Sequence, residues 1–242
     1  MSGHSHFATI KRQKETKDAA RGKIFSKMAK EIAIAVKAGG NPDPNFNYHL
    51  RMVLDKARSY NMPKINVDRA ISSAASNEAL EEIVYEGFGP SGVQVMVYAA
   101  TDNRNRTAQA IKNAFERGGG SLAGPGAVSF NFENKGYLLV EKKGDSQTQM
   151  LDLIDLGAED VEESDDGIEV YVSPEGLSAL REKVEQKGFV VKEADLFMKA
   201  KSYQTISNSE QATKVLKFME DMDDQEDVQK VFSNLDIPDA IK

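Results

Sequence analysis

Residues 137–172 read YLLVEKKGDSQTQMLDLIDLGAEDVEESDDGIEVYV, and the fold assignment rests first on these residues. A strand is predicted over residues 137–141 and a helix over residues 147–156. Two more strands are expected on either side of Asp165-Asp166-Gly167, because an Asp-Gly pair between apolar runs is a strong hairpin signal.

A helix after Pro174 and a strand that begins near Phe189 follow this hairpin. The predicted order is therefore β-α-β-β-α-β, the order of a split βαβ or ferredoxin-like domain. We assign this domain to residues 134–205.

The stretch before it also mixes strands and helices. Period-two alternation predicts strands around residues 83–85 and 93–97, followed by a helix over 105–117 and a strand over 128–132.

The end of the chain predicts a helix over residues 211–222 and a strand around 228–235. Two such elements cannot form a stable domain alone. We therefore expect them to return to the preceding domain, which would consist of residues 77–133 plus 206–242, with the third domain inserted in the second.

The beginning of the chain predicts three helices, over about residues 21–38, over 48–60 and after Asn61, with Pro63 in the first turn of the third. The first helix has an apolar face, and on the opposite face a lysine stripe that should at least be solvated: Lys23, Lys27, Lys30 and Lys37. These helices form a basic domain of residues 1–76. The fold class is thus α+β, with a three-helix domain and two α/β domains.

Charge is distributed unevenly along the chain. Residues 1–75 contain 14 basic and 6 acidic side chains, a net charge of +8, while the remaining residues carry −15. This asymmetry predicts an N-terminal module that binds a polyanion, followed by acidic domains. The alternative is that surface charge segregates between domains without function.

Composition excludes several classes of function. Cysteine is absent, which rules out disulfides, thiol catalysis and Cys-ligated metal sites. His4 and His6 lack supporting ligands, so we expect no metal and no cofactor. We also expect no enzymatic activity; the alternative hypothesis is a metal-dependent hydrolase that uses the acidic clusters.

The longest apolar runs, such as residues 32–36, are too short to span a bilayer, and the N-terminus lacks the apolar stretch of a signal peptide. We expect a cytoplasmic protein with no membrane partner.

Two glycine-rich stretches resemble nucleotide-binding loops only superficially. Residues 87–92 match G-x-G-x-x-G, but they connect two strands instead of opening a helix, which favours a hairpin connection. Residues 118–126 lack the Gly-Lys-Ser/Thr ending of a P-loop.

The acidic run 159–166 lacks the spacing of a Ca²⁺ loop and predicts a solvated hairpin. The acidic run 221–227 predicts an exposed helix end and loop.

The basic arm places eight positive charges within twenty residues, from Lys11 to Lys30. Such charges bind phosphates in a salt-sensitive and largely sequence-independent way. His4, His6 and Phe7 add groups that could stack on unpaired bases. The alternative is a merely soluble arm with Phe7 packed on the helices.

A second basic cluster, Arg104 and Arg106, lies at a predicted strand-to-helix turn. Helix N-termini favour phosphate, and two arginines would strengthen that preference. Equally, Asn105 could cap the helix while the arginines pair with local acids, and the sequence leaves both readings open.

Several long strings resemble the YebC family, also called PmpR: Gly3-His4-Ser5, Arg21-Gly22-Lys23-Ile24-Phe25, Asn61-Met62-Pro63-Lys64, Arg69-Ala70-Ile71, Tyr85-Glu86-Gly87-Phe88-Gly89-Pro90 and Asp102-Asn103-Arg104-Asn105-Arg106-Thr107. The resemblance extends over nearly the whole chain. The family pattern begins Gly-His-Ser-Lys-Trp, where this chain has His6 and Phe7 in the last two places, a change that would soften phosphate contact and stacking there.

The resemblance implies three domains and a non-enzymatic regulator of gene expression directed at nucleic acid. Members are described as transcriptional regulators that bind promoter DNA, and others resemble translation factors that act at the ribosome. We expect a DNA-binding transcriptional regulator that acts through its basic N-terminal domain. The alternative is a translation factor that contacts ribosomal RNA.

In either case the acidic domains would provide spacing, partner contacts or a homodimer interface. The residues predicted to bind nucleic acid are His4, Lys11, Arg12, Lys14, Lys17, Arg21, Lys23, Lys27, Lys30, Lys64, Arg69, Arg104 and Arg106.

Overall fold

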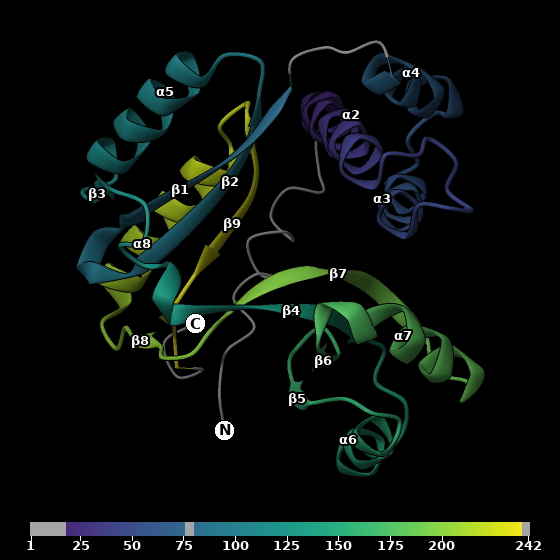
Figure 1. Cartoon of the computed structure of the whole chain (residues 1–242). Helices are drawn as coiled ribbons and strands as arrows, with labels where there is room; N and C mark the ends of the chain where they lie inside the picture. Colours follow the sequence, from purple (N-terminus) through teal and green to yellow (C-terminus); the bar gives the residue numbers. More distant parts are fainter. Residues whose placement is uncertain (1–17, 76–79, 239–242) are drawn as a thin grey trace. The chain divides into compact units, whose positions relative to one another are not determined.

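The computed structural model describes residues 18–75 and 80–238, which divide into two compact units (Figure 1). The larger unit contains residues 18–75, 80–128 and 213–233, and the smaller unit contains residues 129–212 and 234–238. Each unit contains a four-stranded sheet. The predicted α+β class is confirmed, and the three domain boundaries stay a prediction.

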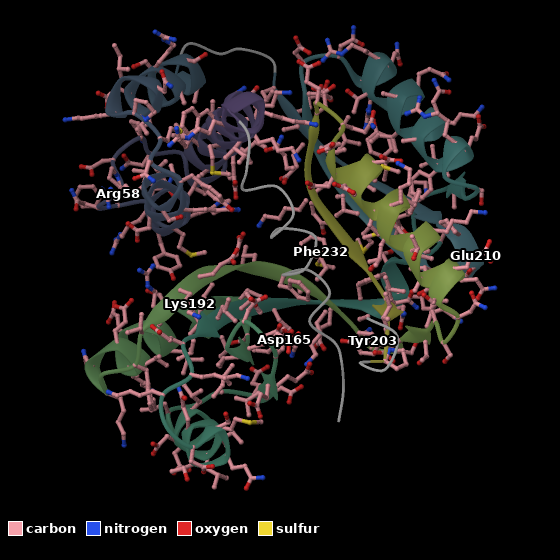
Figure 2. All side chains as sticks on the ribbon, turned by 180° about the vertical axis from the view of Figure 1, so that it is seen from behind. Arg58, Asp165, Lys192, Tyr203, Glu210 and Phe232 are labelled. Carbon is pink, nitrogen blue, oxygen red and sulfur yellow. The ribbon has the colours of Figure 1, made fainter. Side chains whose placement is uncertain are left out.

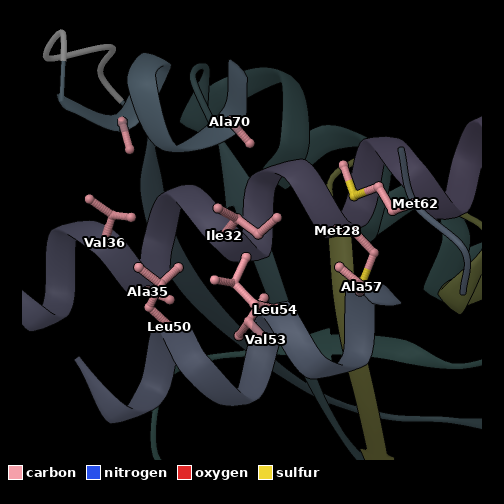
Figure 3. Close-up of a cluster of buried hydrophobic side chains, with 11 residues drawn as sticks. Met28, Ile32, Ala35, Val36, Leu50, Val53, Leu54, Ala57, Met62 and Ala70 are labelled. Carbon is pink, nitrogen blue, oxygen red and sulfur yellow. The ribbon is translucent and has the colours of Figure 1, made fainter. Parts of the chain in front are cut away.

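Three helices open the larger unit: α2 (Asp18–Gly39), α3 (Tyr48–Ser59) and α4 (Lys64–Ala75). Their apolar faces meet in one core, and Figure 3 shows side chains of the three helices clustered there: Met28, Ile32, Ala35, Val36, Leu50, Val53, Leu54, Ala57 and Ala70. Buried Asn47 fixes the α2–α3 corner. Its side-chain oxygen accepts a hydrogen bond from the Leu50 N–H at 3.0 Å, and its amide donates to the Ala35 carbonyl at 2.8 Å.

The sheet of the larger unit has the strand order β3-β1-β2-β9. Its elements are β1 (Glu81–Phe88), β2 (Gln94–Thr101), α5 (Arg104–Arg117), β3 (Ser121–Ala123), most of α8 (Ser209–Asp223) and β9 (Val228–Ser233). Strand β9 pairs with β2, so the end of the chain returns to the sheet that begins at residue 81. The rings of Phe115 on α5 and Phe218 on α8 lie 5.4 Å apart between centroids.

The first glycine-rich stretch is a hairpin connection, as predicted. Strands β1 and β2 pair antiparallel on either side of a 3-10 turn, Pro90–Gly92. A Cβ atom on Gly87 would lie 2.6 Å from the ring of Phe115, and one on Gly89 would lie 2.9 Å from the ring of Phe218. The absence of a side chain at Gly87 and Gly89 therefore allows α5 and α8 to pack closely against the hairpin of β1 and β2.

The strand predicted over residues 128–132 is wrong. Ser129–Asn131 forms a 3-10 turn, and the strand begins only at Phe132. The reason lies in the buried carboxylate of Glu86, which accepts hydrogen bonds from the N–H groups of Gly126 at 2.8 Å and Val128 at 2.7 Å. This side chain anchors the loop, so Val128 is buried without belonging to a strand.

The smaller unit has the predicted split βαβ order. Its sheet runs β5-β6-β4-β7 with antiparallel neighbours. Its elements are β4 (Phe132–Val140), α6 (Ser146–Asp155), β5 (Asp160–Glu163), β6 (Ile168–Val172), the 3-10 turn Pro174–Gly176, α7 (Leu177–Gln186) and β7 (Val191–Ala200). The expected hairpin at residues 165–167 is confirmed. A short parallel pair, β8 (Gln204–Thr205) with β10 (Leu235–Asp236), was not predicted.

Candidate nucleic-acid interface

The lysine stripe of α2 contacts acidic residues of the same unit. Successive lysines pair with the acids that end α8 and precede β9: Lys23 with Asp224 (3.1 Å), Lys27 with Asp223 (3.2 Å) and Lys30 with Asp227 (2.7 Å). Their spacing of four and three residues places the lysines on one helix face. The expectation that the stripe is at least solvated is confirmed for Lys23, whose side chain is 38% exposed, and is wrong for Lys27 and Lys30, whose side chains are 14% and 21% exposed. The local sequence does not show these contacts, because the acidic partners lie about two hundred positions away.

Asp227 is the centre of this contact. The acidic run was expected to be exposed, but Asp227 is buried, and its carboxylate accepts hydrogen bonds from Lys30 Nζ at 2.7 Å, Thr107 Oγ1 at 2.6 Å and Arg106 Nη2 at 3.1 Å. Burial acts to raise the pKa of Asp227, but the bonds from Lys30, Thr107 and Arg106 outweigh it and lower the pKa. A negative charge is thus held beneath two basic side chains.

The turn before α5 has a different cap from the expected one. Asn103, not Asn105, precedes the helix, and its side-chain oxygen accepts from the Arg106 N–H at 3.1 Å. Arg106 also pairs with Asp102 at 2.8 Å, so the reading in which an arginine pairs with local acids holds for this residue. Exposed Arg104 makes no ion pair with the part of the chain that the structure describes.

A groove of about 610 Å³ lies in the larger unit, between α2, α4 and this turn. Apolar side chains from both helices line it, including Phe25, Ala29, Ala33, Ala70 and Ala74. Its basic lining brings together predicted residues from three elements, Lys30, Arg69 and Arg106, and adds Lys37. Lys37 was missing from the predicted set, although it belongs to the same lysine stripe.

The other predicted residues are distributed as follows. Arg21, Lys64 and Arg69 are exposed. Within residues 18–75 and 80–238, neither Lys64 nor Arg69 makes an ion pair. Arg58 on α3, labelled in Figure 2, is also exposed and pairs with Asp55 at 2.8 Å. His4, Lys11, Arg12, Lys14 and Lys17 lie outside the described residues.

No three His, Asp or Glu side chains gather as metal ligands anywhere in the described ranges. The described helices are also all too short or too polar to cross a membrane.

The fold and the groove define a multidomain α+β protein that gathers basic side chains between a helical module and a sheet. Residues 5–77 match the model of the TACO1/YebC protein N-terminal domain, and residues 80–235 match that of the TACO1/YebC second and third domain. The chain belongs to the TACO1/YebC family.

Relatives match over essentially the whole chain. A "Probable transcriptional regulatory protein" of Dictyoglomus turgidum is 44% identical, with 100% of this chain and 98% of the relative covered. One of the same name from Lactiplantibacillus plantarum is 41% identical, with 99% and 100% covered. The crystal structure of a conserved hypothetical protein from Aquifex aeolicus matches with a TM-score of 0.85 and 41% identity, covering 92% of this chain and 93% of that one.

Proposed function

We propose that this protein is a non-enzymatic, cytoplasmic regulator of gene expression that binds DNA through its basic N-terminal domain. The observation that carries the proposal is the groove in which Lys30, Lys37, Arg69 and Arg106 converge. The names of the relatives, probable transcriptional regulatory proteins, support the regulatory role. The net charge of +8 over residues 1–75 supports a polyanionic partner.

The basic residues have different roles in this proposal. Lys64, Arg69 and Arg104 offer phosphate contacts without first breaking an ion pair of the described chain. Lys23 and Lys27 instead hold the helical module against Asp224 and Asp223 at the end of α8, while Lys30 both lines the groove and pairs with Asp227. Each phosphate that is neutralised releases counterions, so the affinity should fall steeply with salt.

A second candidate, a translation factor that binds ribosomal RNA, is favoured by the apolar lining of the groove. Phe25, Ala29 and Ala33 suit the face of an unpaired base better than the phosphate ridge of a duplex. Reading a major groove also requires a helix face with free polar side chains, and the lysine stripe of α2 is largely engaged.

A competition experiment separates the two candidates. Labelled duplex DNA is bound to the full chain at two salt concentrations and challenged with purified ribosomes or with an equal mass of unrelated duplex. A promoter duplex that resists both competitors supports transcriptional regulation. If ribosomes displace the protein from DNA, and the complex of protein and ribosome persists at the higher salt, the result supports the translation factor instead.

Charge neutralisation in the arm tests the basic domain itself. The Lys11→Gln/Arg12→Gln/Lys14→Gln/Lys17→Gln variant should bind all sequences more weakly and lower the salt slope by about 0.9 for each lost phosphate contact. Unchanged affinity would overturn the proposal. The absence of nucleic-acid cleavage with Mg²⁺ or Mn²⁺ is the control against the hydrolase hypothesis.

A further inference from the structure

One face of the sheet in the smaller unit carries a cluster of aromatic rings. A Cβ atom on Gly136 would meet Leu177 of α7, so this position faces the helix, and the alternation of side chains places neighbouring Tyr137 on the other face. There Tyr137 and Tyr171, which are buried, and Phe197, which is partly buried, come from three adjacent strands and have ring centroids 5.5 to 5.9 Å apart. We call this side of the sheet the aromatic face.

The aromatic face is also strongly acidic. Residues paired directly across neighbouring strands point to the same side of a sheet. The register therefore places six carboxylates and two lysines on this face: Glu133, Asp160, Glu162, Glu169, Glu193, Asp195, Lys135 and Lys199. Burial, followed by the charges of Glu169 and Glu193, raises the pKa of the Tyr137 hydroxyl, as expected for a negative environment.

One lysine shows how the face accommodates a cation. Lys199 Nζ lies 3.8 Å from the centroid of the Tyr171 ring, 2.6 Å from a carboxylate oxygen of Asp160 and 2.7 Å from one of Glu162. The second carboxylate oxygen of Glu162 is buried and accepts no hydrogen bond within the described chain. An acceptor for a further basic group is thus already in place.

We propose that the aromatic face binds the basic N-terminal segment of this same chain, residues 4–17. The segment combines cations with groups that can stack on rings: Lys11, Arg12, Lys14, Lys17, His4, His6 and Phe7, against one acid, Glu15. Fourteen extended residues span about 45 to 50 Å, whereas a unit of this size has a radius of gyration of about 12 Å. The segment is therefore long enough to lie across the whole sheet.

The other acidic surface of the chain is a poorer partner. Its carboxylates, Asp223, Asp224 and Asp227, already receive the lysines of α2, and its residues include no aromatic ring. The arm is also the segment predicted to bind phosphates. Nucleic acid and the aromatic face then compete for the same positive charges, which lowers the affinity for non-specific polyanions.

A tryptophan reporter in the full chain tests the docking, because the sequence contains no tryptophan. The Phe7→Trp chain is compared with the same chain carrying Glu193→Gln/Asp195→Asn on the aromatic face. A matched control carries Glu175→Gln/Glu182→Gln. Both residues are exposed; Glu175 lies in the 3-10 turn before α7, and Glu182 lies in α7. The measurement is quenching of the tryptophan emission by acrylamide.

We expect the tryptophan to be shielded in the reporter chain and in the control. In the face variant, docking should weaken about two- to fivefold for each lost charge pair, and quenching should rise accordingly. A tryptophan as accessible as a free one in the reporter chain, or a face variant indistinguishable from the control, overturns the docking. Shielding lost on dilution overturns the intramolecular form and assigns the face to the arm of a second copy.

Addition of duplex DNA separates this inference from the proposed function. Docking is tested without any nucleic acid, so shielding in a chain that fails to bind DNA supports the docking and overturns DNA binding. DNA that binds and raises the quenching supports both. DNA that binds without changing the quenching overturns the competition.

Discussion

The larger unit contains two sets of basic side chains that look alike in the sequence and have different environments in the structure. Lys23, Lys27 and Lys30 lie against acids that end α8 or precede β9. Lys64 and Arg69 on α4 are exposed and make no ion pair with the part of the chain that the structure describes. A run of basic residues therefore predicts attraction to anions but does not say whether the anion is a phosphate or the protein's own carboxylate.

The two sets should therefore respond differently to mutation. Loss of a lysine that meets a buried carboxylate affects folding, because the acid remains behind without its partner. Loss of an exposed basic residue leaves stability nearly unchanged and affects only the binding of a charged ligand.

The largest effect is expected at the buried acid. Replacing Asp227 with alanine leaves Lys30, Arg106 and Thr107 without their shared acceptor, and the free energy of unfolding should fall by about 2 to 4 kcal/mol. Asp221→Ala is the control, because this exposed residue pairs only loosely, at 3.5 Å from Lys217, and should cost less than about 0.5 kcal/mol. Urea denaturation followed by circular dichroism measures both; equal losses would contradict the distinction between buried and exposed acids.

The second effect concerns the exposed set and is measured as affinity. The Lys64→Ala/Arg69→Ala/Arg104→Ala variant should bind nucleic acid about tenfold more weakly or worse, and the salt slope should fall by about 3, if each residue contacts a phosphate. Thermal stability should stay unchanged.

The matched control removes three exposed lysines elsewhere, Lys112, Lys187 and Lys217. A titration by fluorescence anisotropy at several salt concentrations compares the two variants. The same small loss in both would show that only net charge matters and that Lys64, Arg69 and Arg104 do not define the binding surface.

Much of the fold could be predicted because its signals are local. The Asp-Gly turn and the period-two alternation around it gave the hairpin of β5 and β6 and the split βαβ order. The failures arise where a distant side chain decides. The loop before Ser129 follows the carboxylate of Glu86, more than forty positions away, and no pattern near residue 128 shows this.

The candidate site was predictable in composition but not in its pairings. Helical spacing placed the lysines of α2 on one face, and the 101–107 turn was recognised as a second basic cluster. Which of these cations meets Asp227 depends on how α8 and β9 return to the sheet, a non-local contact. The lysine stripe also contained the signal for Lys37, a groove residue that the predicted set omitted.

The third effect is a pH dependence with a definite sign. The pKa of Asp227 is lowered in the folded chain from its ordinary value of 3.8, so its contribution to stability is present above that pH and is lost as the pH falls through the folded value. The stability difference between the wild-type chain and Asp227→Asn should therefore shrink as the pH falls from 7 into the acid range. Urea denaturation of both chains between pH 7 and about pH 3 measures it; a constant difference would show that Asp227 stabilises the fold through shape alone.

The smallest effect is expected at the outer end of the lysine stripe. The side chains of Lys23 and Asp224 are 38% and 46% exposed, so water screens their attraction, and Lys23→Ala should cost at most about 0.5 kcal/mol. Lys30→Ala should cost more, about 1 to 2 kcal/mol, because the side chain of its partner Asp227 is only 9% exposed. Raising the salt concentration to about 1 M should abolish the small loss and leave most of the larger one, since buried charges are screened less. If the two variants lost the same stability and responded alike to salt, burial of the acidic partner would not determine how strongly each ion pair stabilises the fold.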